Sequence, residues 1–224
     1  MRNLIKKIIH PFFKTGMNIY FSKPRNYSYG DISVTVQPGV FPPHLTISTK
    51  ILLDYLDTED LENKKILELG CGSGIISLFA ASNGAIVTAS DINKVAIEAI
   101  EMASEKNNLK IKAIYSDLFD QLNNLSFDYI IINPPYYPKE PKNIKEKAWY
   151  CGENFEYFEK LFYQLPQYIQ QNNYILMILS EDCDIDYIQS IALKNHILFQ
   201  LIKEQKVVNE QNFIFKIVLD EKVV

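Results

Sequence analysis

Short apolar segments alternate with helical segments between residues 64 and 219, and this alternation constrains the fold more than any other feature of the chain. Strands that alternate with helices indicate βαβ units, in which helices cover both faces of a parallel sheet. The last two strands are too close in sequence for a crossover helix, so we expect them to pair antiparallel. The sequence therefore predicts an α/β fold of the Rossmann-like, doubly wound type, with a seven-stranded, mostly parallel sheet and an antiparallel C-terminal hairpin.

Apolar periodicity and helix-end signals place the individual elements. Asn93 and Asn154 stand where helices should begin, Pro166 stands where a helix should kink or end, and Asn209–Asn212 should form the turn of the hairpin. The expected strands cover residues 65–69, 85–90, 111–116, 127–133, 174–179, 196–207 and 213–219, and the expected helices cover residues 75–82, 93–107, 154–166 and 185–194.

The first 60 residues have a different pattern. Residues 1–25 contain six Lys or Arg residues and no Asp or Glu, and their apolar residues recur at helical spacing. A helix docked on the core fits this pattern, and so does a substrate-docking arm or a membrane-surface helix. Alternation at Asp31–Gln37 predicts a half-exposed strand, and Ser48 is placed to cap a helix that continues to Leu56. We expect residues 1–60 to form a basic arm, a strand and a helix packed on a second unit, residues 61–224.

Composition excludes several classes of protein. The net charge is −4 and the pI is about 5.5, which weighs against a general nucleic-acid binder, because phosphate contacts favour a basic protein. No run of apolar residues reaches the roughly 18 that a membrane span needs. Cys71, Cys151 and Cys183 lack the spacing of a disulfide framework or a zinc site, and the three histidines lack ligand spacing. We expect a cytoplasmic protein without a membrane span or a bound metal.

The segment Glu68–Gly74 follows the first predicted strand of the second unit and opens a helix. Its three glycines allow a ligand to approach the backbone closely, and a helix N-terminus offers free N–H groups. The spacing is E-x-G-x-G-x-G, which differs from the G-x-G-x-x-G fingerprint of dinucleotide-binding proteins and lacks the GK[ST] of phosphate-binding loops. The sequence therefore predicts a ligand-binding turn of another kind.

Two acids close the next two predicted strands. Asp91 ends the second strand, where an acid can accept hydrogen bonds from both ribose hydroxyls of an adenosine. Asp117 ends the third strand and is placed to accept a hydrogen bond from an adenine amino group, while Leu118 packs on the ring. Alone, either acid could serve as a helix-end or loop residue, but together with the glycine loop they predict an adenosine site.

The tetrad Asn133–Tyr136, with the sequence Asn-Pro-Pro-Tyr, ends the fourth predicted strand at the same edge of the sheet. The Asn133 side-chain oxygen and the Pro134 carbonyl can accept hydrogen bonds from a planar, weakly basic nitrogen and favour its rehybridisation in a transition state. Pro134 and Pro135 stiffen the loop, and Tyr136 can stack on a flat acceptor. These residue types predict a clamp for a planar nitrogen, with Asn133, Pro134 and Tyr136 as catalytic residues and all four as substrate-binding residues.

Residues 64–180 resemble the core of class I S-adenosylmethionine-dependent methyltransferases. The resemblance includes the glycine loop, the strand-end acids, the tetrad and the segment Ala148–Asn154, and it is closest to the HemK-like glutamine methyltransferases; Val36–Pro43 is similar to the entry of the small-domain methyltransferases that act on ribosomal RNA. Cys151 and Phe155 stand where that family has glycines. The resemblance implies S-adenosylmethionine as the cofactor, residues 61–224 as the methyltransferase domain, and these cofactor-binding residues: Glu68, Gly70, Cys71, Gly72, Gly74, Asp91, Ile92, Asp117, Leu118 and Asn133.

The resemblance leaves the acceptor open. A protein glutamine, with a release factor as the substrate, fits the tetrad and the acidic charge; an adenine amino group in rRNA, tRNA or DNA fits the lysines at positions 139, 142, 145 and 147. A small-molecule amine or amide is a third possible acceptor, and a non-catalytic scaffold with this fold is a further alternative. Thr49 matches a threonine that precedes the core in the short branch of the glutamine enzymes, whose members work with a small activating partner. Trp149 and Tyr150 could wall the acceptor pocket or anchor their loop.

Overall fold

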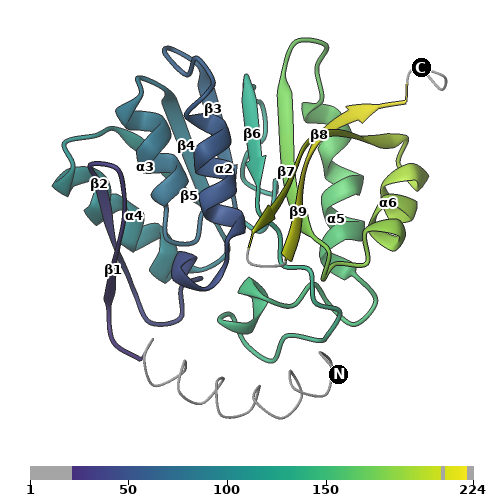
Figure 1. Ribbon diagram of the computed structural model, residues 1–224, viewed down its shortest axis with the longest axis horizontal. Helices are drawn as coiled ribbons and strands as arrows, with labels where there is room; N and C mark the ends of the chain where they lie inside the picture. The colour runs from purple at the N-terminus through teal and green to yellow at the C-terminus, as the bar shows by residue number, and fades with distance from the viewer. Residues whose placement is uncertain (1–21, 208–209, 221–224) are drawn as a thin grey trace.

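The computed structural model describes residues 22–207 and 210–220, so most of the basic segment expected to form an N-terminal helix lies outside the described residues. Within these ranges a seven-stranded sheet is covered by helices on both faces (Figure 1). Its strands are β3 (Lys65–Leu69), β4 (Ile86–Asp91), β5 (Ile111–Tyr115), β6 (Tyr129–Ile132), β7 (Tyr174–Ser180), β8 (Ile197–Val207) and β9 (Glu210–Leu219).

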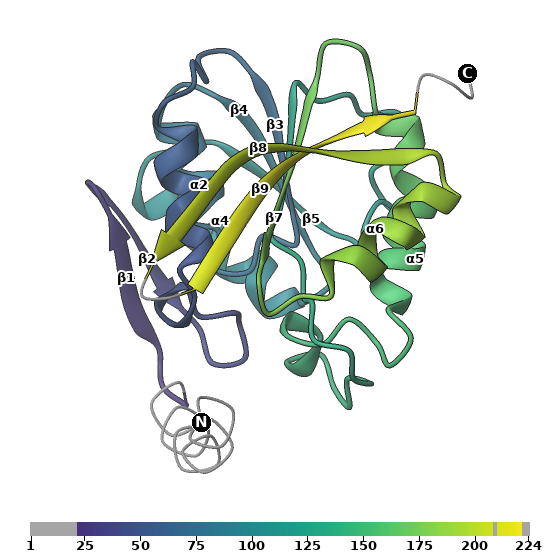
Figure 2. The ribbon, with the colours of Figure 1, turned by 45° about the vertical axis from the view of Figure 1, so that its right-hand side comes forward.

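The strand order across the sheet is β5-β4-β3-β6-β7-β9-β8. The first five strands in this order, β5 to β7, pair in parallel, whereas β9 pairs antiparallel with both β7 and β8. Figure 2 shows the long β8–β9 hairpin at the front, where it forms the edge of the sheet next to β7. The predicted doubly wound α/β fold with an antiparallel C-terminal hairpin is therefore confirmed.

Local signals fix some helix ends and miss others. Asn93 caps its helix as expected, because its side chain accepts a hydrogen bond from the Val95 N–H. The prediction that Ser48 is a cap is wrong: Ser48 is the first helical residue, and Ile47 before it makes no side-chain cap. The helices are α2 (Ser48–Leu56), α3 (Ile75–Ser82), α4 (Lys94–Lys106), α5 (Glu156–Gln164) and α6 (Ile185–Lys194), with 3-10 turns η1 (Pro43–Leu45), η2 (Glu146–Ala148) and η3 (Leu165–Tyr168).

Two further boundaries differ from the expectation. Helix α5 begins at Glu156, two residues later than predicted, because Phe155 before it has a positive φ of 61°. It ends at Gln164, ahead of the 3-10 turn that contains Pro166. The turn predicted at Asn209–Asn212 is too long, because β9 already begins at Glu210 and continues its pairing with β8 from there.

The core lies in two layers on either side of the sheet. Strand β6 explains why: Tyr129 and Ile131 face the layer that contains α2, α3 and α4, while Ile130 and Ile132 face the layer that contains α5 and α6. A strand buried on both faces is a continuous apolar run rather than an alternating one. Burial of both faces holds the carboxyl ends of β3 and β6 in a fixed relation, which positions the loops that follow them.

A small hairpin of β1 (Arg25–Tyr29) and β2 (Ile32–Val36) lies beside the helical layer of α3 and α4 (Figure 1). Strand β1 was not predicted. Val34 and Val36 of β2 are buried in the core, and the Tyr29 hydroxyl donates a hydrogen bond to Asp54 of α2 at 2.9 Å. The described part of the first 60 residues thus packs on the layer of α2–α4; the division of the chain at residue 60 stays a prediction.

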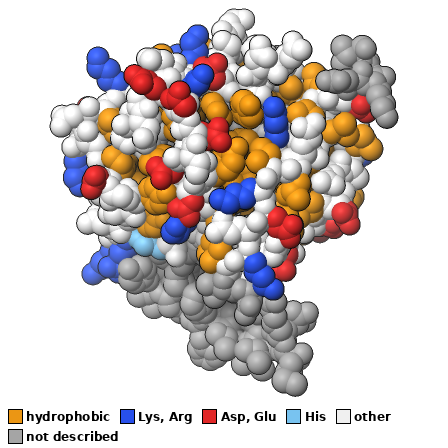
Figure 3. Space-filling model, turned by 45° about the horizontal axis from the view of Figure 1, so that its top comes forward, with side chains coloured by type: hydrophobic (Ala, Val, Ile, Leu, Met, Phe, Trp, Pro, Cys, Tyr) orange, Lys and Arg blue, Asp and Glu red, His pale blue; other side chains and the backbone are white. Residues whose placement is uncertain are grey.

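One face of the molecule is mixed in charge. On the face shown in Figure 3, acidic and basic side chains are interspersed with apolar ones. No helix among the described residues is long and apolar enough to cross a membrane.

Candidate active site

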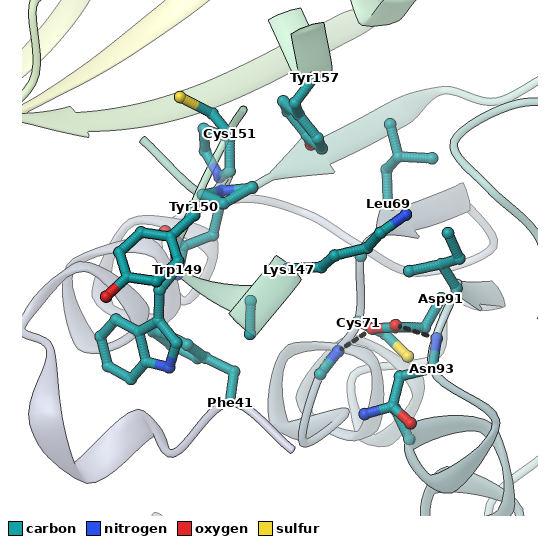
Figure 4. A pocket seen from close by; sticks show the side chains of 18 of the residues that line it. Phe41, Leu69, Cys71, Asp91, Asn93, Lys147, Trp149, Tyr150, Cys151 and Tyr157 are labelled. Atoms are coloured by element: carbon teal, nitrogen blue, oxygen red, sulfur yellow. Dashed lines mark hydrogen bonds between the residues drawn. The ribbon is translucent and has the colours of Figure 1, made fainter. Parts of the chain in front are cut away.

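A cavity of about 380 Å³ lies where β3, β4, β5 and β6 end (Figure 4). The sheet order reverses between β3 and β6, and such a switch point is where doubly wound folds bind ligands. Twelve predicted site residues line it: Glu68, Gly70, Cys71, Gly72, Asp91, Ile92, Asp117, Leu118, Asn133, Pro134, Pro135 and Tyr136. The topology therefore brings the glycine loop, the strand-end acids and the tetrad to one cavity.

The glycine loop is held by its own backbone N–H groups. The N–H groups of Gly70 and Cys71 both donate to the Ser90 carbonyl at 2.9 Å. The Gly72 N–H donates to Asp91 Oδ2 at 2.8 Å, and the Gly74 N–H donates to the Cys71 carbonyl at 2.8 Å. These four N–H groups of the loop donate within the protein, whereas the free N–H groups predicted at the N-terminus of the following helix stay a prediction. The four internal bonds fix the shape of the loop against the end of β4.

Gly74 differs from the other predicted loop residues, because it does not line the cavity. Its φ is +74°, and a Cβ at this position would overlap Ile100 Cδ1 and lie 2.9 Å from Ile100 Cγ1. Only glycine allows α3 to pack so closely on α4 here. The structure thus gives Gly74 a packing role.

Asp91 joins β4 to the glycine loop. Besides the bond from Gly72, its Oδ1 accepts a hydrogen bond from the Asn93 N–H at 2.8 Å (Figure 4). Burial raises its pKa even though these backbone donors oppose the shift. A carboxylate oxygen has further lone pairs, so Asp91 can still accept hydrogen bonds from ligand hydroxyls.

Asp117 has a partner that the sequence did not reveal. Lys160 of α5 lies 2.9 Å from Asp117 Oδ2 and 2.8 Å from Asp120 Oδ2, and it also lines the cavity. Leu118 next to Asp117 is 8% exposed and has a positive φ of 52°, which turns the chain sharply after β5. Lys160 and Leu118 thus fix the orientation of the predicted adenine-binding acid.

Glu68 lies at the floor of the cavity, 6% exposed. Its Oε2 accepts hydrogen bonds from the Ser77 N–H at 2.8 Å and from the Ser77 hydroxyl. Burial raises its pKa to about 8, against these hydrogen bonds, which lower it. The side chain therefore anchors the first turn of α3 to β3 in addition to lining the cavity.

The raised pKa of Glu68 predicts a specific pH dependence of stability. The unfolded chain releases the proton near pH 4.5, whereas the folded protein keeps it up to about pH 8. The stabilisation that this proton provides is thus complete below pH 4.5 and is lost as the pH rises to about 8, by ~5 kcal/mol. Glu68→Gln keeps a neutral hydrogen-bond acceptor for Ser77, so the free energy of unfolding should fall less steeply over this range in denaturant titrations.

The control for this measurement is Glu105→Gln, an exposed glutamate on α4. It should leave the pH profile of unfolding unchanged. If Glu68→Gln and wild-type protein show parallel profiles, the buried carboxyl is already ionised at pH 5.

Thr49 contacts Asn133 of the tetrad, which lies 84 residues further along the sequence. Its Oγ1 lies 3.4 Å from Asn133 Nδ2, which donates to it, and Thr49 is 4% exposed. Tyr136 is half-buried, and its hydroxyl is hydrogen-bonded with the side chain of Ser180 at the end of β7; burial raises its pKa, so the phenol stays neutral. The clamp is thus connected to α2 on one side and to β7 on the other.

The cavity has a roof formed by two loops. The rings of Phe41 and Trp149 lie 4.9 Å apart at 50°, and both residues line the cavity together with Tyr150 (Figure 4). Lys139 lies over the Tyr150 ring at 4.4 Å. Trp149 therefore both walls the cavity and anchors its loop, where the sequence allowed either role.

The segment before α5 keeps the backbone shape of a glycine-rich stretch. Phe155 has a φ of 61°, a left-handed conformation at a position where the resembling family has glycine, while Gly152 has a φ of 94°. Cys151 is buried, and burial raises its pKa to about 11, as it raises that of Cys71. Neutral thiols of this kind are poor nucleophiles.

The sequence missed most cavity residues outside the motifs. Thr46, Tyr157 and Lys160 line the cavity but belong to no recognised motif. The position of α5 directly after the Ala148–Asn154 segment is a signal that could have indicated the last two. The described residues contain no cluster of three or more His, Cys, Asp or Glu suited to a metal ion.

Comparison with known proteins identifies the family. The model of the family described as methyltransferase small domain matches residues 31–149. A protein of Methanocaldococcus jannaschii named "Putative protein N5-glutamine methyltransferase" is 30% identical over 155 residues, 66% of this chain and 76% of that protein. Ribosomal RNA small subunit methyltransferase C of Haemophilus ducreyi is 31% identical over 116 residues, 50% of this chain and 35% of that protein. The chain thus spans about a third of this second relative.

Solved structures show the same fold. The T. thermophilus 16S rRNA N2 G1207 methyltransferase, in complex with S-adenosylmethionine and guanosine, superposes with a TM-score of 0.62 at 18% identity, over 86% of this chain and 50% of that chain. The E. cuniculi Mtq2–Trm112 complex, responsible for methylating the eRF1 translation termination factor, gives 0.62 at 20% identity, over 81% and 99%. With the site geometry, these findings show that the chain belongs to the methyltransferase small domain family of S-adenosylmethionine-dependent methyltransferases.

Proposed function

We propose that this protein methylates the side-chain amide nitrogen of a glutamine in a protein substrate of the release-factor kind. The orientation of Asn133 carries the proposal: because its Nδ2 donates to Thr49 Oγ1, its Oδ1 is left to accept a hydrogen bond from an acceptor nitrogen.

The clamp suits an acceptor nitrogen whose lone pair is delocalised. S-adenosylmethionine supplies an activated methyl group on its sulfonium sulfur when it is bound. Asn133 Oδ1 and the Pro134 carbonyl accept the two N–H bonds of a primary amide, and this arrangement favours a pyramidal nitrogen whose lone pair is free to attack. Pro134 and Pro135 restrict the loop and so preserve the alignment.

Tyr136 completes the acceptor side without adding charge. Its phenol is neutral and tied to Ser180, and its ring centroid lies 4.8 Å from that of Tyr137. A flat amide can stack on such a ring. The proton that the nitrogen loses can leave after methyl transfer, so the proposal needs no general base.

The pattern of relatives supports a protein acceptor over an RNA acceptor. The match covers 76% of the relative named for glutamine methylation and 99% of the Mtq2 chain. It covers only 35% of the ribosomal RNA enzyme. The net charge of −4 also favours a protein substrate. A small activating partner belongs to the same proposal, since Mtq2 was solved in complex with Trm112.

A labelled transfer assay in cell extract tests the acceptor class, since extract supplies both substrate and any partner. Protein incubated with S-adenosylmethionine labelled in its methyl group should place the label in the protein fraction, on a glutamine after digestion, with Asn133→Ala as the blank. Label confined to RNA would overturn the proposal.

The amino group of a nucleobase is the second candidate. It is also a planar nitrogen, and the T. thermophilus relative by fold was solved with guanosine. Four lysines in the loop after the tetrad could meet phosphates. In the same assay this candidate requires RNA labelling that declines steeply with salt.

A further inference from the structure

Two lysines of the described chain line the cavity, and they differ in their partners. Lys160 forms ion pairs with Asp117 and Asp120. Lys147, on the η2 turn beside Trp149, has no ion-pair or hydrogen-bond partner for its ammonium among the described residues. Lys147 is therefore the one cation lining the described cavity that is available to an incoming anion.

The side chain of Lys147 lines the cavity and is exposed to solvent. Figure 4 shows it extending from its loop toward Leu69, the last residue of β3, with Tyr157 on one side and Asp91 on the other. In the view of Figure 4 its ammonium points in the direction of the end of the strand that leads into the glycine loop.

Most of the other ionisable side chains that line the cavity are acidic and disfavour a bound anion. Its lining includes the carboxyl groups of Asp91, Asp117, Glu140 and Glu156. Four backbone N–H groups of the glycine loop already donate within the protein. A cationic side chain therefore adds stabilisation to a carboxylate that binds near Leu69.

We propose that the Lys147 ammonium binds the methionine carboxylate of S-adenosylmethionine. Asp91 and Asp117 are the predicted partners of the ribose and the adenine, which leaves the amino-acid end of the cofactor for the part of the cavity between Leu69 and the tetrad. A charge-assisted hydrogen bond from Lys147 satisfies the carboxylate there. The proposal concerns the cofactor alone and holds for a glutamine or a nucleobase acceptor.

A pair of ligands that differ only in the carboxylate tests the proposal. Calorimetry compares S-adenosylhomocysteine with its decarboxylated analogue, adenosyl-thiopropylamine, on wild-type protein and on Lys147→Met. The substitution should weaken S-adenosylhomocysteine about 10- to 30-fold, as expected for one charge-assisted hydrogen bond, and should leave the affinity for the analogue unchanged or slightly higher. Lys147→Arg should restore most of the preference for the carboxylate.

Lys142→Met is the matched control, because Lys142 is exposed on the same loop but does not line the cavity. It should bind both ligands as the wild type does. Equal weakening of both ligands by Lys147→Met would overturn the proposal and assign Lys147 to packing of the roof. Unchanged binding of both, with a raised KM for the acceptor, would also overturn it and assign Lys147 to the substrate. Neither result bears on whether the acceptor is a glutamine.

Discussion

Asn133→Ala should lower kcat by at least about 100-fold while the affinity for S-adenosylhomocysteine stays within a few-fold of wild type. The loss follows from the removal of a preorganised acceptor aimed at the attacking nitrogen, a change that ordinarily costs two to three orders of magnitude in rate. Cofactor binding should survive, because the glycine loop and Asp91 do not depend on Asn133 for their hydrogen bonds. Single-turnover transfer and calorimetry on the same preparation measure the two effects.

Two companion variants separate chemistry from structure. Thr49→Val removes the hydroxyl that orients the Asn133 amide and should reduce kcat by a smaller factor, about 10-fold, through misalignment. Asn172→Ala, in the exposed turn before β7, should have no effect. Substantial turnover by Asn133→Ala would show that the clamp is assigned wrongly.

Asp91→Ala should lower the affinity for S-adenosylhomocysteine about 100-fold. The carboxylate is the predicted partner of the ribose hydroxyls, and two hydrogen bonds to a charged group account for about 3 kcal/mol. It is also the anchor of Gly72, so the substitution leaves that N–H without its acceptor and loosens the loop. Calorimetry measures the total loss of affinity for the ligand. Thermal unfolding without ligand measures the loss of stability that comes from the loosened loop.

A ligand without the 2′-hydroxyl distinguishes the two contributions of Asp91. Wild-type protein should bind 2′-deoxy-S-adenosylhomocysteine more weakly than the parent ligand, whereas Asp91→Ala should bind the two equally. Asp186→Ala, on the exposed side of α6, is the control and should keep the wild-type preference. A preference that persists in Asp91→Ala would place the ribose elsewhere.

The sequence predicted what short-range patterns determine. The apolar run of β6 and the capping by Asn93 depend on neighbours within a few residues, and both are found where expected. The location of the glycine loop, Asp91, Asp117 and the tetrad at one edge follows from parallel topology alone. This is why the order of the residues along the chain was sufficient to infer the fold and the general position of the site.

The details that escaped prediction are long-range. The ion pair between Lys160 and Asp117 joins residues far apart in sequence, and no local pattern marks either as a partner of the other. The packing role of Gly74 depends on Ile100, one helix further along the chain. Side-chain direction is equally hidden: the four loop lysines look alike in sequence, but only Lys147 of these lines the cavity.

The bond from Gly72 to Asp91 and the paired bonds to the Ser90 carbonyl have an entropic consequence. A loop that is already closed by its own hydrogen bonds has few conformations to lose when a ligand arrives, so little of the binding free energy is consumed in ordering it. Differences in affinity between related ligands then measure contacts to the ligand itself, with little contribution from a change in loop order. For the same reason the loop cannot reshape to accommodate a different nucleotide, and its rigidity acts as a filter for adenosine-bearing ligands of one shape.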